Sequence, residues 1–279
     1  MSPHTNISAR AVTALKCISI ASLLVASIVA EAQPADRRTS TGAIGIRFQD
    51  FLNQVDTTAD STAKGNLIDS YISRVRSYGH AVIEDSIIHF LYWGKAQRVG
   101  VAGDINGWSP TADTMIRIPM TNLFHHPMSM QLAARFEYKL VVDSTWILDP
   151  LNQQEAVGGY GSNSEIRMPQ YHPPTEIDYQ ANIPHGKIDS LTISSRLLRR
   201  THPVLVYLPP DYKKFSHKRY PSIYVTDGGE YISLALMQHI LDNLIAEKRI
   251  APLIAVFVDP RTDIRNSATS MRMHDYAMS

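Results

Sequence analysis

The sequence predicts a multidomain fold in which short helices and an antiparallel β-sandwich precede an α/β segment. Apolar residues recur at helical spacing before residue 79, and short alternating runs fill residues 84–169. From Tyr220 to Val258 the order is strand, turn, helix, strand, with Asp227-Gly228-Gly229 as the turn. Because ligands of open α/β sheets bind outside the carboxyl ends of the strands, we expect a site at this turn.

Composition limits the classes of function. The chain is 44% hydrophobic and 19% charged, which is ordinary for one large or two modest globular domains. It has 27 Lys and Arg against 26 Asp and Glu, a formal net charge of +1. A balanced charge offers no field that would hold a polyanion, so we expect no nucleic-acid partner.

Residues 1–32 have the pattern of an export signal. Arg10 and Lys16 supply positive charge, Cys17 to Ala30 is an uncharged apolar run, and Ala30-Glu31-Ala32 gives the small-x-small cleavage pattern. A membrane anchor is the alternative, but it would need about 20 apolar residues. The sequence therefore predicts a periplasmic or extracellular protein with no membrane attachment after cleavage. Cys17, the single cysteine, would leave with the signal, which excludes disulfides and cysteine catalysis.

Residues 33–83 are predicted to be a polar leader followed by a short helical region. Apolar residues recur at helical spacing from Phe48 to Val55 and again from Leu67 to Val75. The polar stretch from Asp56 to Gly65 is expected to separate two helices. Their apolar faces are interpreted as packing faces, with partner binding as the alternative.

Residues 84–169 are predicted to form an antiparallel sandwich, because Gly, Pro, Asn and Asp turns separate short β-type runs. We expect strands at Ile87 to Trp93, Arg98 to Ala102, Met115 to Ile118, Phe136 to Val142, Thr145 to Leu148 and Ser164 to Met168.

Part of this region resembles a known module. Gly103-Asp-Ile-Asn-Gly-Trp108, Phe136-Glu-Tyr-Lys139 and Trp146-Ile-Leu-Asp-Pro-Leu-Asn152 are similar to the early-set, immunoglobulin-like (Ig-like) module of glycogen-branching enzymes. The resemblance implies a carbohydrate partner that would stack on Trp108 or Trp146. The alternative is that both tryptophans serve packing.

Two further patterns do not predict cofactors. Gly158-Gly-Tyr-Gly161 lacks the Lys-Ser/Thr ending of a phosphate loop and opens no helix, so we interpret it as a loop between strands. No two histidines show the i, i+4 spacing with a glutamate that a zinc hydrolase uses. We therefore expect no metal and no other cofactor.

Residues 170–185 are rich in Pro and Tyr, which is typical of an extended linker, and residues 186–279 follow as the α/β segment. Ile188 to Ser194 and Val204 to Leu208 are expected strands. Ile223 to Val225 is expected to lead into one helix, Ile232 to Arg249. Leu253 to Val258 is apolar on both faces, as a buried parallel strand should be.

This segment resembles the enterochelin-esterase-like branch of the α/β-hydrolases. The resemblance rests on Val206-Tyr-Leu-Pro-Pro-Asp-Tyr212, Tyr220-Pro221, Asp227-Gly228, Leu241-Asp-Asn-Leu-Ile245, Val256-Phe-Val-Asp-Pro260 and Arg272-Met-His-Asp-Tyr276. It implies a serine carboxylic-ester hydrolase that acts on a small-molecule ester or an acylated sugar. Gly228 and Gly229 match the oxyanion-hole loop, whereas an ordinary turn is the alternative. Arg272 and Tyr276 match a loop near the substrate mouth.

No residue of this sequence matches a catalytic residue of the family. The nucleophile elbow Gly-x-Ser-x-Gly does not occur in it, and the acid and histidine follow that elbow in the family. We therefore expect an incomplete α/β-hydrolase domain, a fragment that is inactive by itself. The alternatives are a carbohydrate-binding or structural sandwich module without catalysis, and a non-functional truncated product that aggregates.

Overall fold

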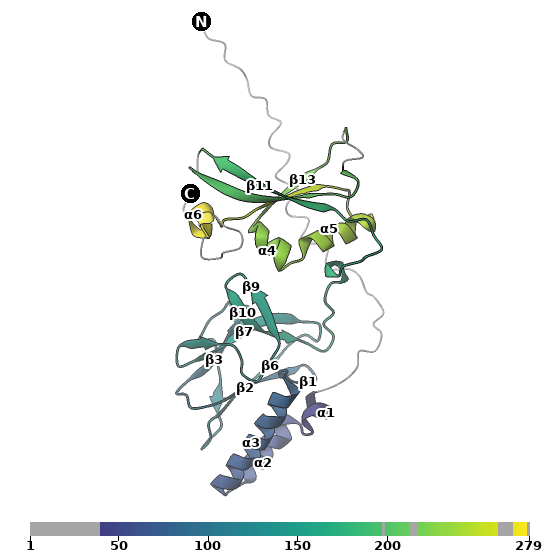
Figure 1. Cartoon of the computed structure of the whole chain (residues 1–279). Helices are drawn as coiled ribbons and strands as arrows, with labels where there is room; N and C mark the ends of the chain where they lie inside the picture. The colour runs from purple at the N-terminus through teal and green to yellow at the C-terminus, as the bar shows by residue number, and fades with distance from the viewer. Residues whose placement is uncertain (1–39, 197–198, 213–216, 262–269, 278–279) are drawn as a thin grey trace. The chain divides into compact units, whose positions relative to one another are not determined.

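The computed structural model describes residues 40–196, 199–212, 217–261 and 270–277 (Figure 1). The predicted signal, residues 1–32, and the leader up to residue 39 lie outside the described residues. Within the described ranges, no helix combines the length and apolar character needed to cross a bilayer.

The helical region contains α1 (Ser40–Ile44), α2 (Phe48–Thr57) and α3 (Ser61–Tyr78). The expected break from Asp56 to Gly65 is shorter than predicted, because the Asp60 carboxylate accepts a hydrogen bond from Ala63 N–H and starts α3 at once. Gly79 ends α3 in the left-handed conformation, with φ of 74°.

Two antiparallel sheets follow the helices. One sheet has the order β1-β2-β6-β5, and the other has the order β4-β3-β7-β10-β9, with β8 paired to β7. The strands of the first are β1 (Val82–Glu84), β2 (Ile87–Trp93), β5 (Ile116–Arg117) and β6 (Leu123–Ser129). Those of the second are β3 (Val99–Gly103), β4 (Asp113–Thr114), β7 (Arg135–Val142), β8 (Thr145–Ile147), β9 (Glu155–Gly158) and β10 (Gly161–Arg167).

Two apolar cores hold this region together. Phe90 of β2 and Phe124 of β6 share one core with Val101 of β3 and Tyr138 of β7, so the two sheets form a sandwich. A second core joins α1, α2 and α3 to the first sheet through residues such as Phe51 and Leu123. The predicted packing faces of the helices are therefore buried within the chain.

The C-terminal sheet has the order β11-β12-β14-β13. Only β13 and β14 pair in parallel, and the other pairs are antiparallel. Its elements are β11 (Lys187–Ser195), β12 (Arg200–Leu208), β13 (Ser222–Thr226), α4 (Gly228–Ser233), α5 (Met237–Ala246), β14 (Ile254–Val258) and α6 (Arg272–Ala277). The strand, helix, strand order is as predicted.

The expected single helix from Ile232 to Arg249 is wrong. The chain forms α4 and α5 instead, because Leu236 lies in the left-handed region with φ of 52° and interrupts the helical path. The apolar periodicity of the sequence could not predict this break, because Leu234 and Leu236 continue the helical pattern.

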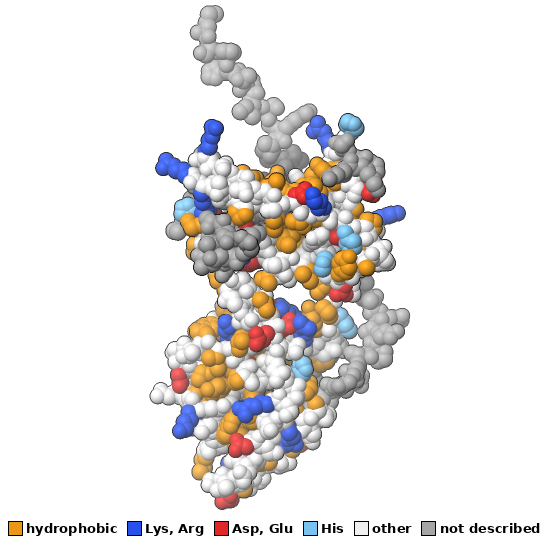
Figure 2. Space-filling view, in the orientation of Figure 1, with side chains coloured by type: hydrophobic (Ala, Val, Ile, Leu, Met, Phe, Trp, Pro, Cys, Tyr) orange, Lys and Arg blue, Asp and Glu red, His pale blue; other side chains and the backbone are white. Residues whose placement is uncertain are grey.

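The expectation that β14 is buried on both faces is also wrong. Ala255 and Phe257 are buried against the helices, whereas Ile254, Val256 and Val258 are half-buried. Cross-strand pairing puts Tyr224 beside Val256 on this second face, and Tyr224 is 75% exposed. Figure 2 shows that apolar side chains reach the surface of the part that holds α4 and α5.

Residues 170–185 contain a short 3-10 turn, η3 (Thr175–Ile177), and are tied to α5. Asn243 Nδ2 donates to the carbonyl oxygens of Glu176 and Asp178, each at 2.8 Å. The buried Asp242 carboxylate accepts from Gly186 N–H at 2.8 Å and lies 3.1 Å from His185 Nδ1. These bonds fix the predicted linker onto one helix.

Candidate active site at the carboxyl end of β13 and β14

The turn after β13 is built from one strained residue and two glycines. Asp227 has φ of 54°, in the left-handed region, and Gly228 and Gly229 then open α4 as buried residues. A Cβ on Gly228 would lie 2.5 Å from the carbonyl carbon of Phe257 in β14. Glycine is therefore required at 228, because α4 and β14 approach so closely.

The Gly229 amide already binds a carboxylate of the chain. Gly229 N–H donates to Asp259 Oδ2 at 2.8 Å, and Asp259 follows β14 directly. Arg261 holds the same carboxylate through its N–H and its guanidinium, with Nε 2.6 Å from Oδ1. Burial by itself would raise the pKa of Asp259, but the hydrogen bonds from Arg261 and Gly229 outweigh it and lower that pKa.

Arg272 and Tyr276 lie at the same turn. Arg272 Nε is 3.1 Å from both carboxylate oxygens of Asp227, and Tyr276 Oη accepts from Asp227 N–H at 3.4 Å. Both residues come from α6, so the structure brings together the four residues for which the family resemblance implies a site role: Gly228, Gly229, Arg272 and Tyr276.

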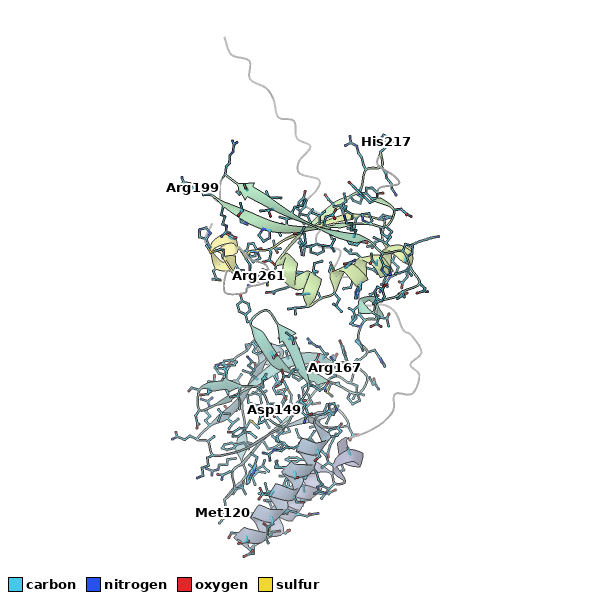
Figure 3. All side chains as sticks on the ribbon, in the orientation of Figure 1. Met120, Asp149, Arg167, Arg199, His217 and Arg261 are labelled. Atoms are coloured by element: carbon cyan, nitrogen blue, oxygen red, sulfur yellow. The ribbon has the colours of Figure 1, made fainter. Side chains whose placement is uncertain are left out.

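A pocket opens beside this turn. Its lining includes Asp227, Glu230, Asp259, Arg261, Ser270 and Arg272, and Figure 3 shows Arg261 close to α4 and α6. The two arginines are paired with Asp259 and Asp227, so most of the charge in the pocket is internally neutralised. No histidine occurs among the described lining residues, so they supply no imidazole base.

The arrangement can bind an anionic oxygen through backbone amides. Asp259 shows this directly, because its carboxylate oxygen accepts a hydrogen bond from Gly229 N–H. Within the described residues Gly228 N–H has no hydrogen-bond partner. A substrate oxyanion would therefore either use Gly228 N–H or displace Asp259 from Gly229.

The two tryptophans with a proposed carbohydrate role also lie close together. The ring centroids of Trp108 and Trp146 are 6.5 Å apart at 27°, and Trp146 is 44% exposed. Trp108 Nε1 donates to Asp104 Oδ1, and its φ of 61° is positive. Neither ring belongs to the buried cores of the described residues.

Sequence reasoning missed Asp259 and Arg261 as site residues. A signal for Asp259 was present, because a carboxylate that directly follows a buried strand lies at the edge where the site is expected. No such signal was present for Arg261, because an arginine after a proline is a common surface residue.

Residues 194–277 match the family model described as "Putative esterase". This part of the chain is esterase-like. Solved structures show weaker likeness. Ferric enterobactin esterase from Salmonella typhimurium is 17% identical, with a TM-score of 0.47, over 64% of this chain and 55% of that one. Enterobactin esterase from Shigella flexneri is 18% identical, with a TM-score of 0.46, over 70% and 60% of the two chains.

The esterase-like chain thus spans 55% and 60% of the lengths of these two enzymes. A feruloyl esterase module from Clostridium thermocellum is 26% identical, with a TM-score of 0.27, and the likeness covers 32% of each chain. TM-scores below 0.5 do not establish a shared fold for the whole chain.

Proposed function

We propose that residues 186–279 form the oxyanion-binding part of the site of a serine carboxylic-ester hydrolase of the enterochelin-esterase-like kind. The match of residues 194–277 to the esterase family model carries this proposal. The buried glycines at 228 and 229 support it, because an acyl-transfer site needs backbone N–H donors where negative charge develops. The proposed substrate is a small-molecule ester, either a siderophore ester or an acylated sugar.

We also propose that these 279 residues are inactive by themselves. The sequence has no Gly-x-Ser-x-Gly elbow, and the described pocket lining contains no histidine. Without the nucleophile and its base, only weak residual catalysis remains from binding and the oxyanion site. The purified chain should not react with a fluorophosphonate probe. Covalent labelling of any serine in the folded chain would contradict this proposal.

The esterase proposal is tested by the coding DNA downstream of codon 279. We expect a continuation that encodes a Gly-x-Ser-x-Gly elbow, and the extended product should hydrolyse p-nitrophenyl acetate. In that product, loss of one oxyanion donor should lower kcat by about 10²-fold or more. A downstream sequence with no homologous continuation in any reading frame would refute the proposal.

Export is proposed from residues 1–32, and its test is independent of catalysis. The mature protein should begin at Gln33 and be recovered outside the cytoplasm. Amino-terminal sequencing of the expressed protein checks this, and an intact Met1 on the recovered protein would argue against cleavage.

Carbohydrate binding by the sandwich is a second candidate, favoured by the ring contact between the half-buried Trp108 and the exposed Trp146. Sugars bind on exposed aromatic faces, so starch or xylan oligosaccharides should change tryptophan fluorescence. A Trp93→Phe background leaves these two rings as the only indoles. Fluorescence that stays constant with both ligands would exclude this function.

A further inference from the structure

A second pocket lies between α3 and the first sheet of the sandwich, far in sequence from the esterase-like segment. Its volume is about 350 Å³, within the range of small-molecule sites. We call it the helix-sheet pocket. The lining residues used below are Lys64, Gly65, Ile68, Trp93, Arg117 and Met120.

The charged groups of this pocket are all cationic. Lys64 and Arg117 line it, and no carboxylate is among the described lining residues. Neither cation forms an ion pair with a carboxylate in the described part of the chain. The pocket therefore offers positive charge that the chain does not neutralise, which favours an anionic ligand.

Arg117 is held in place by uncharged partners. Its Nε donates to the carbonyl oxygen of Thr121 at 2.6 Å, and its Nη2 donates to Asn122 Oδ1 at 2.8 Å. Its guanidinium carbon lies 5.8 Å from the centre of the Phe124 ring. These contacts leave Nη1 without a hydrogen bond to any described residue, so a fixed donor remains for a ligand carboxylate.

The rest of the wall is apolar. Ile68 and Trp93 line it from α3 and β2, and Met120 lies in the turn between β5 and β6. Met120 has φ of 60° and is 92% exposed, so the turn keeps a large apolar side chain in solvent (Figure 3). A left-handed, exposed methionine has a conformational cost, and such residues are enriched at ligand sites.

The positive charge of the pocket comes from side chains and not from the backbone N–H groups at the amino-terminal end of α3. Asp60 already accepts the Ala63 N–H of the first turn, so the side chains of Lys64 and Arg117 supply the positive charge. Gly65 leaves the wall open on the helix side, because a Cβ there would meet no atom within 4 Å.

We propose that the helix-sheet pocket binds a small aromatic carboxylate. The carboxylate pairs with Lys64 and Arg117, and the ring packs against Trp93 and Met120. A bare phosphate lacks the ring, and an aromatic alcohol lacks the charge, so both bind more weakly. The site does not depend on the proposed esterase activity.

Benzoate is the probe for the test, with benzyl alcohol and inorganic phosphate as matched controls. A Trp108→Phe, Trp146→Phe chain keeps Trp93 as its only indole, so its fluorescence reports this pocket. Benzoate should quench it saturably, and each control compound should bind about fivefold or more weakly. Equal affinity for benzoate and either control, or no saturation with millimolar benzoate, would overturn the proposal.

Substitutions localise the binding. Lys64→Gln should weaken benzoate binding about fivefold, whereas Lys95→Gln, at an exposed position outside the lining, should leave it unchanged. Gly65→Leu should fill the pocket and abolish binding, while Asn66→Leu, at an exposed position of α3 outside the lining, retains it. Thermal unfolding checks that both leucine variants fold. Benzoate binding that is unchanged in Lys64→Gln, or that persists in folded Gly65→Leu, would refute the site.

Discussion

At the residue scale, one carboxylate determines how the esterase-like turn is held. Asp259 is 1% exposed and binds both Gly229 N–H and Arg261. An amide that holds an internal carboxylate is oriented before any ligand arrives. Asp259 therefore positions the turn, and it also competes for the amide that a substrate oxyanion would use.

Asp259→Ala should destabilise the C-terminal sheet by about 2–3 kcal/mol, because it leaves the largely buried Arg261 without its partner. Urea denaturation of the parent and variant measures the loss. Asp189→Ala is the control, since the Lys187–Asp189 pair on the same sheet is exposed and should contribute less than about 1 kcal/mol. Equal losses in the two variants would contradict the role of Asp259.

Replacing glycine by alanine should change stability in opposite directions at positions 228 and 65. At position 228 the new Cβ would lie 2.5 Å from the Phe257 backbone, so Gly228→Ala should cost about 1–3 kcal/mol. At position 65 the Cβ meets nothing within 4 Å, so Gly65→Ala should stabilise α3 by up to about 1 kcal/mol. Thermal denaturation of both variants tests the pair, and a stabilised Gly228→Ala would refute the close approach.

The sequence was most informative about residues at the ends of strands. Asp-Gly-Gly after a β-rich run predicted where Gly228 and Gly229 lie, because strand ends are marked by turn residues. It could not predict that Asp259 would occupy the Gly229 amide, since that contact joins residues 30 positions apart. Hydrogen bonds between distant residues leave no periodic pattern.

At the scale of elements, a histidine pair connects α2 to the first sheet. His89 Nδ1 of β2 lies 3.1 Å from His125 Nε2 of β6, and the Phe48 ring packs on both imidazoles. Glu84 of β1 faces His89 at 3.6 Å and accepts from Phe48 N–H, while Arg47 lies 3.5 Å from Glu84. Burial, with His89 and His126 nearby, lowers the pKa of His125 to about 3.

This lowered pKa predicts acid sensitivity of the helices on the sandwich. Above the ordinary histidine pKa of 6.5 the stabilisation is fully present, and it is lost as pH falls from 6.5 toward 3. His125 keeps some solvent contact, so we expect a loss of about 1–2 kcal/mol between pH 7 and pH 4. Denaturation at several pH values should show a smaller loss in His125→Gln than in the parent.

His172→Gln, at an exposed histidine, is the control for this pH dependence and should behave as the parent does. If the parent and His125→Gln lose the same stability between pH 7 and pH 4, the histidine pair is not the cause.

Strands were predicted where their residues alternate, and missed where they do not. The strand expected at Ile87 to Trp93 is confirmed as β2 with the same bounds. β6 was missed, because His125, His126 and Pro127 interrupt its apolar pattern. Its position between β2 and β5 buries His125 against Phe48, and that tertiary contact overrides a weak local strand signal.

At the scale of the whole molecule, the C-terminal sheet leaves apolar residues in solvent. Leu191 and Ile193 of the edge strand β11 are 50% and 51% exposed, and Tyr224 of β13 is 75% exposed. Exposed apolar edge strands pair readily with other chains. We therefore expect the 279-residue chain to self-associate as its concentration rises.

Replacing Leu191 and Ile193 together with lysine should reduce this self-association, because charge on an edge strand opposes pairing. Light scattering after size-exclusion chromatography measures it. Thr57→Lys, at an exposed position of α2, is a control for added charge. Equal association in the parent and the Leu191→Lys, Ile193→Lys chain would show that β11 is not the contact surface.

The hydrogen bonds from α5 to residues 176–186 bear on where the chain can be cut. Proline-rich spacers are usually accessible to proteases, but Asn243 and Asp242 hold the backbone of this stretch at Glu176, Asp178 and Gly186. A polypeptide that starts at Gly186 would leave both Asn243 donors unpaired. One that starts at residue 170 would retain every one of these bonds, and is the better choice for expressing the C-terminal sheet alone.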